Sequence, residues 1–231
     1  MRNQPTGCNH TESKSKPSIT CRLHSTAAAA PGERVVVLMS AGNLATTQAV
    51  VSLLDERSKA VAERTHTLLE TPSMYQTARL VGNTVKEVIL ASSPTGEKAD
   101  SYFNASFVLG GQIKGSPPRL FMIYPEGNFI EATEDTPYLQ IGEHKYGKPI
   151  LDRVVRPETS LEEARKAVLL SMDSTLRSNL SVGMPLDYAE IAAGACRVTR
   201  SQRIEAQDED FRAMSQAWSN ALRDGFQKIR I

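Results

Sequence analysis

The residues best suited to chemistry lie between Ser171 and Tyr188, in the stretch Ser171-Met-Asp-Ser-Thr-Leu-Arg-Ser-Asn-Leu-Ser-Val-Gly-Met-Pro-Leu-Asp-Tyr188. The pattern predicts the end of an amphipathic helix, a polar turn and then a strand. A scaffold can hold polar side chains rigidly at such a junction while leaving them reachable. A capped helix followed by a tight turn would use the same residue types, because Ser, Asn and Gly are ordinary turn residues. Features elsewhere in the chain are needed to distinguish between these two interpretations.

A second polar junction follows the first apolar run of the chain. Val35-Val-Val-Leu-Met39 is short, continuous and rich in β-branched residues, which predicts a buried strand. The strand ends at Ser40-Ala-Gly-Asn43, where Gly42 permits a sharp turn or a close backbone approach.

Cysteine and histidine residues near the N-terminus raise the question of a metal site. Cys8-x-His10 and Cys21-x-x-His24 could together supply four ligands to zinc. The first spacing is too tight for a usual structural site, and no apolar core surrounds these residues, so we predict no metal. Because Cys196 lies far from the other two cysteines, no disulfide framework is indicated. Nothing in the sequence suggests an organic cofactor.

The bulk properties exclude several classes of function. The chain has 231 residues and a formal charge of +1, so no basic surface for nucleic acid or for an anionic membrane is indicated. No apolar run is long enough to span a bilayer, and the polar N-terminus lacks a secretory apolar core. We therefore expect a soluble cytoplasmic protein with reduced thiols.

Several elements must position the two junctions. Residues 1–30 have few large apolar side chains and are expected to form a disordered tail ahead of one domain over 31–231. In the first half, we predict a helix from Leu44 with a possible break near Ser58, a helix capped by Ser73, and a loop over 91–100. Strands are expected over 103–109, 119–124, 128–132 and 138–141, joined by loops that include 110–118.

The second half contains three predicted helices and a strand pair. A helix is expected over 148–155, and Ser160 with Glu163 forms a capping box that starts the helix leading into the polar stretch. Strands over 184–192 and 195–200 would turn at Ala193-Gly194. The last helix begins near Asp208, and its apolar stripe consists of Phe211, Met214, Trp218, Leu222 and Phe226. Alternating groups of helices and antiparallel strands predict a four-layer α+β sandwich, with two sheets stacked between helices.

Five motifs resemble the bacterial proteasome-type peptidases called Anbu, the ancestral beta-subunit branch of the N-terminal-nucleophile hydrolases. They are Ser40-Ala-Gly-Asn-Leu-Ala-Thr-Thr-Gln48, Phe103-Asn-Ala-Ser-Phe-x-Leu-Gly-Gly-Gln-Ile-Lys-Gly115, Arg119-Leu-Phe-x-Ile-Tyr-Pro-Glu-Gly-Asn-Phe-Ile-Glu-Ala-Thr133, Gln140-Ile-Gly-Glu-x-Lys-Tyr-Gly-Lys-Pro-Ile-Leu-Asp152 and Asp173-Ser-Thr-x-Arg-Ser-Asn-Leu-Ser-Val-Gly183. The match covers about residues 31–226. The resemblance implies an αββα fold and a threonine or serine peptidase that works on peptide substrates and assembles with copies of itself into rings or helical stacks.

The resemblance also implies roles for individual residues. Gly42 would donate its backbone N–H to the oxyanion, and Ser181 would support the amino group of an N-terminal nucleophile. Ser178 and Asn179 would line the site, and Ser178 stands where many proteasome subunits have an Asp. Ser40 and Ala41 would contact the substrate.

The N-terminal region departs from the family pattern. The tail has no Asp, and Cys21-Arg-Leu-His24 only faintly matches an Arg-Lys-x-His pair, which would put Arg22 at the position of the catalytic Lys. Arg does not replace Lys there, because it cannot easily deprotonate or mimic a compact ammonium. No nucleophile is identified by its context. A wrong start or a shifted reading frame upstream of Pro31 would explain the abrupt loss of resemblance.

Three hypotheses remain open. The first is an intact peptidase that needs processing to expose Thr6, Thr11, Ser13 or Thr20. The second, which we favour for the chain as written, is a proteasome-type subunit without a competent nucleophile that serves in assembly, with marginal solubility if its first strands are missing. The third is an unrelated binding module on the same fold. No pattern identifies a natural substrate or an unfoldase partner.

Overall fold

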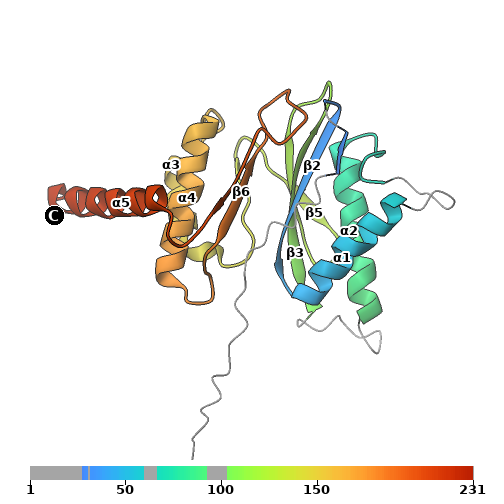
Figure 1. The fold of residues 1–231 in the computed structure, drawn as a ribbon, viewed down its shortest axis with the longest axis horizontal. Coiled ribbons are helices and arrows are strands. Elements are labelled where there is room, and N and C mark those ends of the chain that lie inside the picture. Colours follow the sequence, from blue (N-terminus) through green and yellow to red (C-terminus); the bar gives the residue numbers. More distant parts are fainter. Residues whose placement is uncertain (1–27, 31, 60–66, 93–102, 231) are drawn as a thin grey trace, which may run out of the picture.

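The computed structural model describes residues 28–30, 32–59, 67–92 and 103–230, and it has the predicted four-layer α+β arrangement. Helices α1 (Leu44–Lys59) and α2 (Met74–Ser92) cover one face of a five-stranded sheet, sheet A. A two-stranded sheet, sheet B, lies on the other side of sheet A (Figure 1), and α3 (Lys148–Val154) and α4 (Leu161–Ser178) cover it. The last helix, α5 (Glu209–Lys228), projects away from these layers.

Sheet A is antiparallel throughout, and its strands lie side by side in chain order. They are β1 (Ala28–Ala30), β2 (Arg34–Gly42), β3 (Ala105–Ile113), β4 (Arg119–Ile123) and β5 (Phe129–Glu131). The strand β1 consists of the last three residues of the predicted tail. Residues 1–27 of that tail lie outside the described residues.

The strand β3 is longer than predicted, because it continues through Gly110 and Gly111, which we expected in a loop. Gly111 pairs with Val36 on β2 and faces α2. A side chain at Gly111 would overlap the carbonyl oxygen of Val35 and approach the Met74 methyl group to 2.7 Å. Glycine therefore stays in the strand because it lets β2 and α2 pack closely against it.

The hydrophobic core lies between sheet A and helices α1 and α2. Its fully buried members come from both helices and from β2, β3 and β4, and include Val50, Val81, Val85, Phe107 and Phe121. Alternate residues of each strand face the helices, which is the period that a sheet with one covered face requires.

Sheet B contains β6 (Leu186–Glu190) and β7 (Arg200–Ile204), so the predicted bounds 184–192 and 195–200 are wrong. A turn does form at Gly194, but it lies inside a long connection. The Gly194 N–H donates to Gln112 Oε1 of sheet A over 2.9 Å, and Thr199 closes the connection by donating its N–H to the Glu190 carbonyl. These bonds hold the connection in place, so the second strand begins later in the chain than predicted.

The predicted strand over 138–141 is absent, because these residues cross from sheet A to α3 without joining a ladder. The hydroxyl of Tyr138 instead donates to Asp152 on α3, and Lys148 donates to the same hydroxyl over 3.0 Å. A 3-10 turn, η2 (His144–Tyr146), follows the crossing.

The predicted helix starts are confirmed. Ser160 and Glu163 form the capping box of α4, Asp208 accepts from the Phe211 N–H at the start of α5, and Ser73 Oγ accepts from the Gln76 N–H. Each cap satisfies a backbone donor that the helix itself leaves unpaired. Among the helices that the structure describes, none is both long and apolar enough to cross a bilayer.

Candidate active site

Gly42 ends β2 in a backbone conformation that excludes other residues. Its φ is +113°, and a side chain there would overlap the Asn104 carbonyl oxygen and approach the Ala105 Cα to 3.0 Å. The next residue, Asn43, donates its N–H to the same Asn104 oxygen over 2.9 Å. The turn after β2 is therefore fixed by its own backbone and by the loop before β3.

Asn43 connects this turn to the start of α1. Its side-chain oxygen accepts from the Thr46 N–H over 2.9 Å, and its carbonyl oxygen accepts from the Thr47 hydroxyl over 2.8 Å. This is the N-cap arrangement that Asn favours. The positive end of the α1 dipole consequently lies beside Gly42, where it would stabilise a developing negative charge.

Ser40 and Ala41 form the last part of β2 before Gly42. Both are partly exposed, and they pair with Phe107 and Ser106 of β3. The crossing segment packs closely here, because a side chain on Gly142 would lie 3.3 Å from the Ala41 Cβ. The predicted substrate-contacting residues therefore lie at an accessible strand end, and the crossing segment packs against one side of it.

The turn between α4 and β6 holds the other predicted site residues. Ser178 is the last residue of α4 and is exposed, and Asn179 follows it as the C-terminal cap residue. The Asn179 side-chain oxygen accepts from the Ser181 N–H over 2.9 Å and from the Ser181 hydroxyl over 2.7 Å. Asn179 and Ser181 are both half-buried, so this local pair orients the serine within the turn.

The hydrogen bond to Asn179 determines what the Ser181 hydroxyl can still do. A serine hydroxyl has one proton to donate and two lone pairs that can accept. Because the proton is directed at Asn179, the oxygen remains an acceptor. An acceptor oxygen is what a protonated amino group requires.

A buried network that the sequence did not predict fixes the end of α4. Asp173 is 4% exposed and accepts from Ser215 Oγ of α5 over 2.7 Å and from Arg177 Nε over 3.2 Å. Arg177 also donates to Ser215 Oγ over 2.6 Å. The spacing of Asp173 and Arg177 is a sequence signal for a helical ion pair. Ser215 carried no such signal, because it comes from another helix.

The loop beside Ala41 is tied to α3 by charged hydrogen bonds. Lys148 Nζ donates to Asp152 over 2.6 Å and to the Tyr138 hydroxyl. The hydrogen bond from Lys148, followed by that from Tyr138, lowers the pKa of Asp152, while desolvation and then the bond to Asp152 raise the pKa of Tyr138. These bonds position the crossing segment next to the end of β2.

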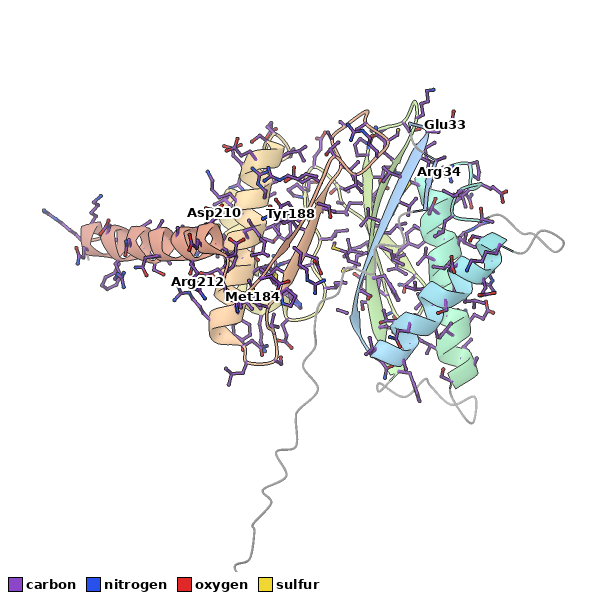
Figure 2. All side chains as sticks on the ribbon, viewed as in Figure 1. Glu33, Arg34, Met184, Tyr188, Asp210 and Arg212 are labelled. Atoms are coloured by element: carbon purple, nitrogen blue, oxygen red, sulfur yellow. The ribbon has the colours of Figure 1, made fainter. Side chains whose placement is uncertain are left out.

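The β2–α1 turn and the α4–β6 turn lie at the same end of the layers (Figure 1). In Figure 2, Met184, which ends the α4–β6 turn, lies toward this end, whereas Glu33 and Arg34 mark the opposite end of β2. No hydrogen bond among the described residues joins Ser181 directly to Gly42. The two turns therefore share one end of the layers, one beside sheet A and one beside sheet B.

The predicted residues of the N-terminal region lie outside the described residues. They are Arg22, the possible nucleophiles Thr6, Thr11, Ser13 and Thr20, and the possible zinc ligands Cys8, His10, Cys21 and His24. Within the described ranges, no group of three His, Cys, Asp or Glu side chains could hold a metal ion. Gly42, Ser178, Asn179 and Ser181 are the predicted catalytic and lining residues that the structure places.

Comparisons with known proteins identify the family of this chain. The family model described as proteasome subunit matches residues 32–191. The structure of Anbu from Hyphomicrobium sp. strain MC1 is 56% identical with a TM-score of 0.81, and the match covers 88% of this chain and 83% of that chain. No curated protein matched this chain.

Two further solved structures give the same TM-score of 0.81, and each match covers 88% of this chain and 83% of the other. Anbu (ancestral beta-subunit) from Yersinia bercovieri is 47% identical, and the helical assembly of the Anbu complex from Pseudomonas aeruginosa is 45% identical. The resemblance inferred from the five motifs is confirmed. The chain belongs to the proteasome subunit family, in its Anbu (ancestral beta-subunit) branch, with the N-terminal-nucleophile hydrolase fold.

Proposed function

We propose that this chain is a self-assembling proteasome-type subunit whose site is built for peptide-bond hydrolysis by an N-terminal threonine or serine. One observation carries the proposal: the Ser181 hydroxyl donates a hydrogen bond to the Asn179 side-chain oxygen over 2.7 Å, so the serine oxygen can still accept one from an ammonium. The Gly42 turn, whose positive φ favours glycine, lies at the same end of the layers. Ser181 would support the amine of the nucleophile, and Gly42 would donate its N–H to the oxyanion.

The chemistry follows from these two groups. The free α-amine of the nucleophile titrates near neutral pH and accepts the hydroxyl proton as the oxygen attacks the peptide carbonyl carbon. The Gly42 N–H and the start of α1 stabilise the resulting oxyanion. The ammonium then protonates the departing amine, and water hydrolyses the ester that remains. Ser181 keeps the amine oriented through both steps, and Ser40 and Ala41 bind the substrate backbone.

The residues of the N-terminal region argue for weak or absent turnover by the chain as written. The first 30 residues contain no Asp, and only a faint motif match would put Arg22 at the position of the catalytic Lys. An arginine cannot supply the proton transfers that a lysine with a lowered pKa supports. A non-catalytic assembly subunit is therefore the second candidate function. The absence of a disulfide pattern in the sequence supports a cytoplasmic location for either one.

Self-assembly is supported by the relatives. The Pseudomonas aeruginosa relative, 45% identical, forms a helical assembly of the Anbu complex. Subunits that contact each other through different surfaces close into rings or continue as helices. We propose that this chain forms such an assembly with copies of itself, and that peptides are its substrates.

Three measurements on the purified full chain test the proposal. They are intact mass with N-terminal sequencing, hydrolysis of unstructured peptides, and molar mass in solution. We expect an assembly larger than a monomer, an unprocessed N-terminus and little turnover. A mature N-terminal Thr or Ser with turnover that Ser181→Ala abolishes would overturn the assignment of weak activity and support the peptidase. A monomer at all concentrations would overturn self-assembly.

A further inference from the structure

The helix α5 buries a polar residue against the rest of the chain. Within Glu209–Lys228, all of which the structure describes, Ser215 is the one buried residue, with 8% exposure. The apolar residues of the same helix are half-buried or exposed. Burying a hydroxyl costs free energy unless the hydroxyl is hydrogen-bonded. The hydrogen bonds of Ser215 therefore matter for how α5 packs on α4.

The Ser215 hydroxyl bridges two charged residues of α4. It donates to Asp173 Oδ1 over 2.7 Å and accepts from Arg177 Nη2 over 2.6 Å. Its single proton is used for the carboxylate, and a lone pair is used for the guanidinium. Asp173 and Arg177 also contact each other over 3.2 Å, but the Arg177 side chain is 56% exposed. Since an ion pair with an exposed partner gains little energy from holding one geometry, Ser215 supplies the second contact that fixes Arg177.

Arg177 lies in the last turn of α4, immediately before the candidate site turn. Asn179 caps this helix by donating its N–H to the Thr175 carbonyl over 2.9 Å. The structure describes the whole segment from Thr175 to Leu186, and none of the residues between these two is buried. Apolar packing therefore does not fix the segment. Its position depends on the end of α4, which the network through Ser215 holds.

Asn179 connects the end of α4 to Ser181. The N–H and the hydroxyl of Ser181 both donate to the Asn179 side-chain oxygen, over 2.9 Å and 2.7 Å. In the same turn, the Val182 N–H donates to the Asn179 carbonyl over 3.3 Å. A shift of the end of α4 would therefore move the acceptor of both Ser181 bonds at once.

We propose that Ser215 is a positioning residue of the candidate site. Through Asp173 and Arg177 it fixes the last turn of α4, and it thereby orients the Ser181 hydroxyl that would support the amine of the nucleophile. This role rests on the proposed function, and it adds a residue of α5 to a site whose other described members lie on β2 and on the α4–β6 turn. Ser215 acts through the end of the helix, because its hydroxyl bonds Asp173 and Arg177 rather than Ser181.

The first test measures hydrogen exchange at the Ser181 and Val182 amides of the purified full chain, resolved to single residues by fragmentation. Ser215→Ala removes the bridging hydroxyl. The matched control is Ser219→Ala, because the Ser219 hydroxyl donates to the Ser215 carbonyl within its own helix over 3.0 Å. We expect exchange at both amides to become about tenfold faster in Ser215→Ala and to stay unchanged in Ser219→Ala.

The Ser116 amide is the internal reference for this measurement. It donates to the Ile113 carbonyl over 2.9 Å in the exposed turn between β3 and β4, so its exchange should be the same in all three proteins. An equal acceleration at Ser116 and Ser181 would show a general loss of structure and would overturn the positioning role. Unchanged exchange at Ser181 in Ser215→Ala would overturn it as well.

The second test examines whether Ser215 acts through Asn179. Asn179→Ala removes the acceptor of both Ser181 bonds, so this change alone should accelerate exchange at Ser181. Adding Ser215→Ala should then change the rate by less than about twofold, because the connection from α5 to Ser181 is already broken. A further acceleration of about tenfold would show that the two residues act independently, and Ser215 would not be a positioning residue for Ser181.

Neither exchange measurement depends on turnover. A chain that hydrolyses no peptide still tests the role of Ser215, whereas peptide hydrolysis with N-terminal sequencing tests the proposed function separately.

Discussion

The two halves of the sandwich differ in how much of their packing they supply themselves. Sheet A has five strands and encloses the main core with α1 and α2, and residues such as Phe107, Phe121 and Ile123 have no solvent exposure. Sheet B has two described strands, and β7 exposes every residue except Ile204. Leu186 is one of the few buried residues on that side. The sheet A half encloses its own apolar core, whereas fewer apolar side chains of the described sheet B half are buried.

This difference shows how the candidate site is built. Gly42 belongs to the well-packed half, where backbone contacts define its conformation. Ser181 belongs to the sparsely packed half, where Asn179 and the Asp173 network define the turn. A site that spans both halves requires sheet A to position Gly42 and the sheet B half to position Ser181. We therefore expect substitutions in the two halves to change stability by different amounts.

The largest expected effect is on the core of sheet A. Phe107→Ala should lower the free energy of unfolding by about 3–5 kcal/mol, because it removes a fully buried ring and leaves a cavity. Leu186→Ala in sheet B should cost about 2 kcal/mol, since the surrounding half can relax into the space. Chemical denaturation of both variants measures the contrast. Equal losses would mean that the two halves are packed equally well.

The Asp173 network should give the next largest effect. Asp173→Ala leaves the Ser215 hydroxyl and Arg177 without their buried acceptor, which should destabilise the chain by about 1–3 kcal/mol. Asp135→Ala, in an exposed loop, is the matched control and should change stability by less than about 0.5 kcal/mol. Similar denaturation midpoints for both variants would show that the sheet B half does not depend on this network.

A glycine pair tests the two turns of the site. Gly42→Ala should destabilise the chain by about 1–3 kcal/mol, because φ is +113° and the new methyl group overlaps the Asn104 carbonyl. Gly183→Ala has open space around it and should be neutral or stabilising by about 0.5 kcal/mol. Thermal unfolding compares the two variants. If Gly42→Ala is tolerated as well as Gly183→Ala, the backbone at Gly42 does not fix the β2–α1 turn.

The smallest effect concerns the loop between the halves. The hydrogen bond from Lys148, and then that from Tyr138, lowers the pKa of Asp152, so the charged carboxylate stabilises the fold above its unfolded pKa. This contribution is lost as the pH falls through the folded pKa. Asp152→Asn should therefore reduce stability slightly at neutral pH and match the unchanged chain in acid. A constant difference across this pH range would contradict the assignment.

The sequence predicted most elements and the order of the layers, because helix caps and apolar periods are local signals. Ser160, Asp208 and Gly42 behave as their residue types indicate. The wrong predictions concern segments whose structure depends on long-range contacts. Gly111 stays in β3 because α2 packs on it, and the connection after β6 is long because Gln112 holds Gly194.

The sequence also predicted the turns on which the described candidate site residues lie. The motif containing Asn179 and Ser181 located one turn, and the orientation of the Ser181 hydroxyl required coordinates. Ser215 could not be found from the sequence, since its relation to Asp173 exists only after α4 and α5 pack. The sequence also did not show that the end of the α5 apolar stripe is exposed, because periodicity predicts an apolar face but not what covers it.

The most direct test of the account is peptide hydrolysis by the purified full chain, measured beside Ser181→Ala with the N-terminus of each protein sequenced. We predict an assembled protein with an unprocessed N-terminus and a hydrolysis rate no higher than that of Ser181→Ala. A released N-terminal Thr or Ser, together with turnover that Ser181→Ala removes, would contradict the assignment of weak activity to the chain as written.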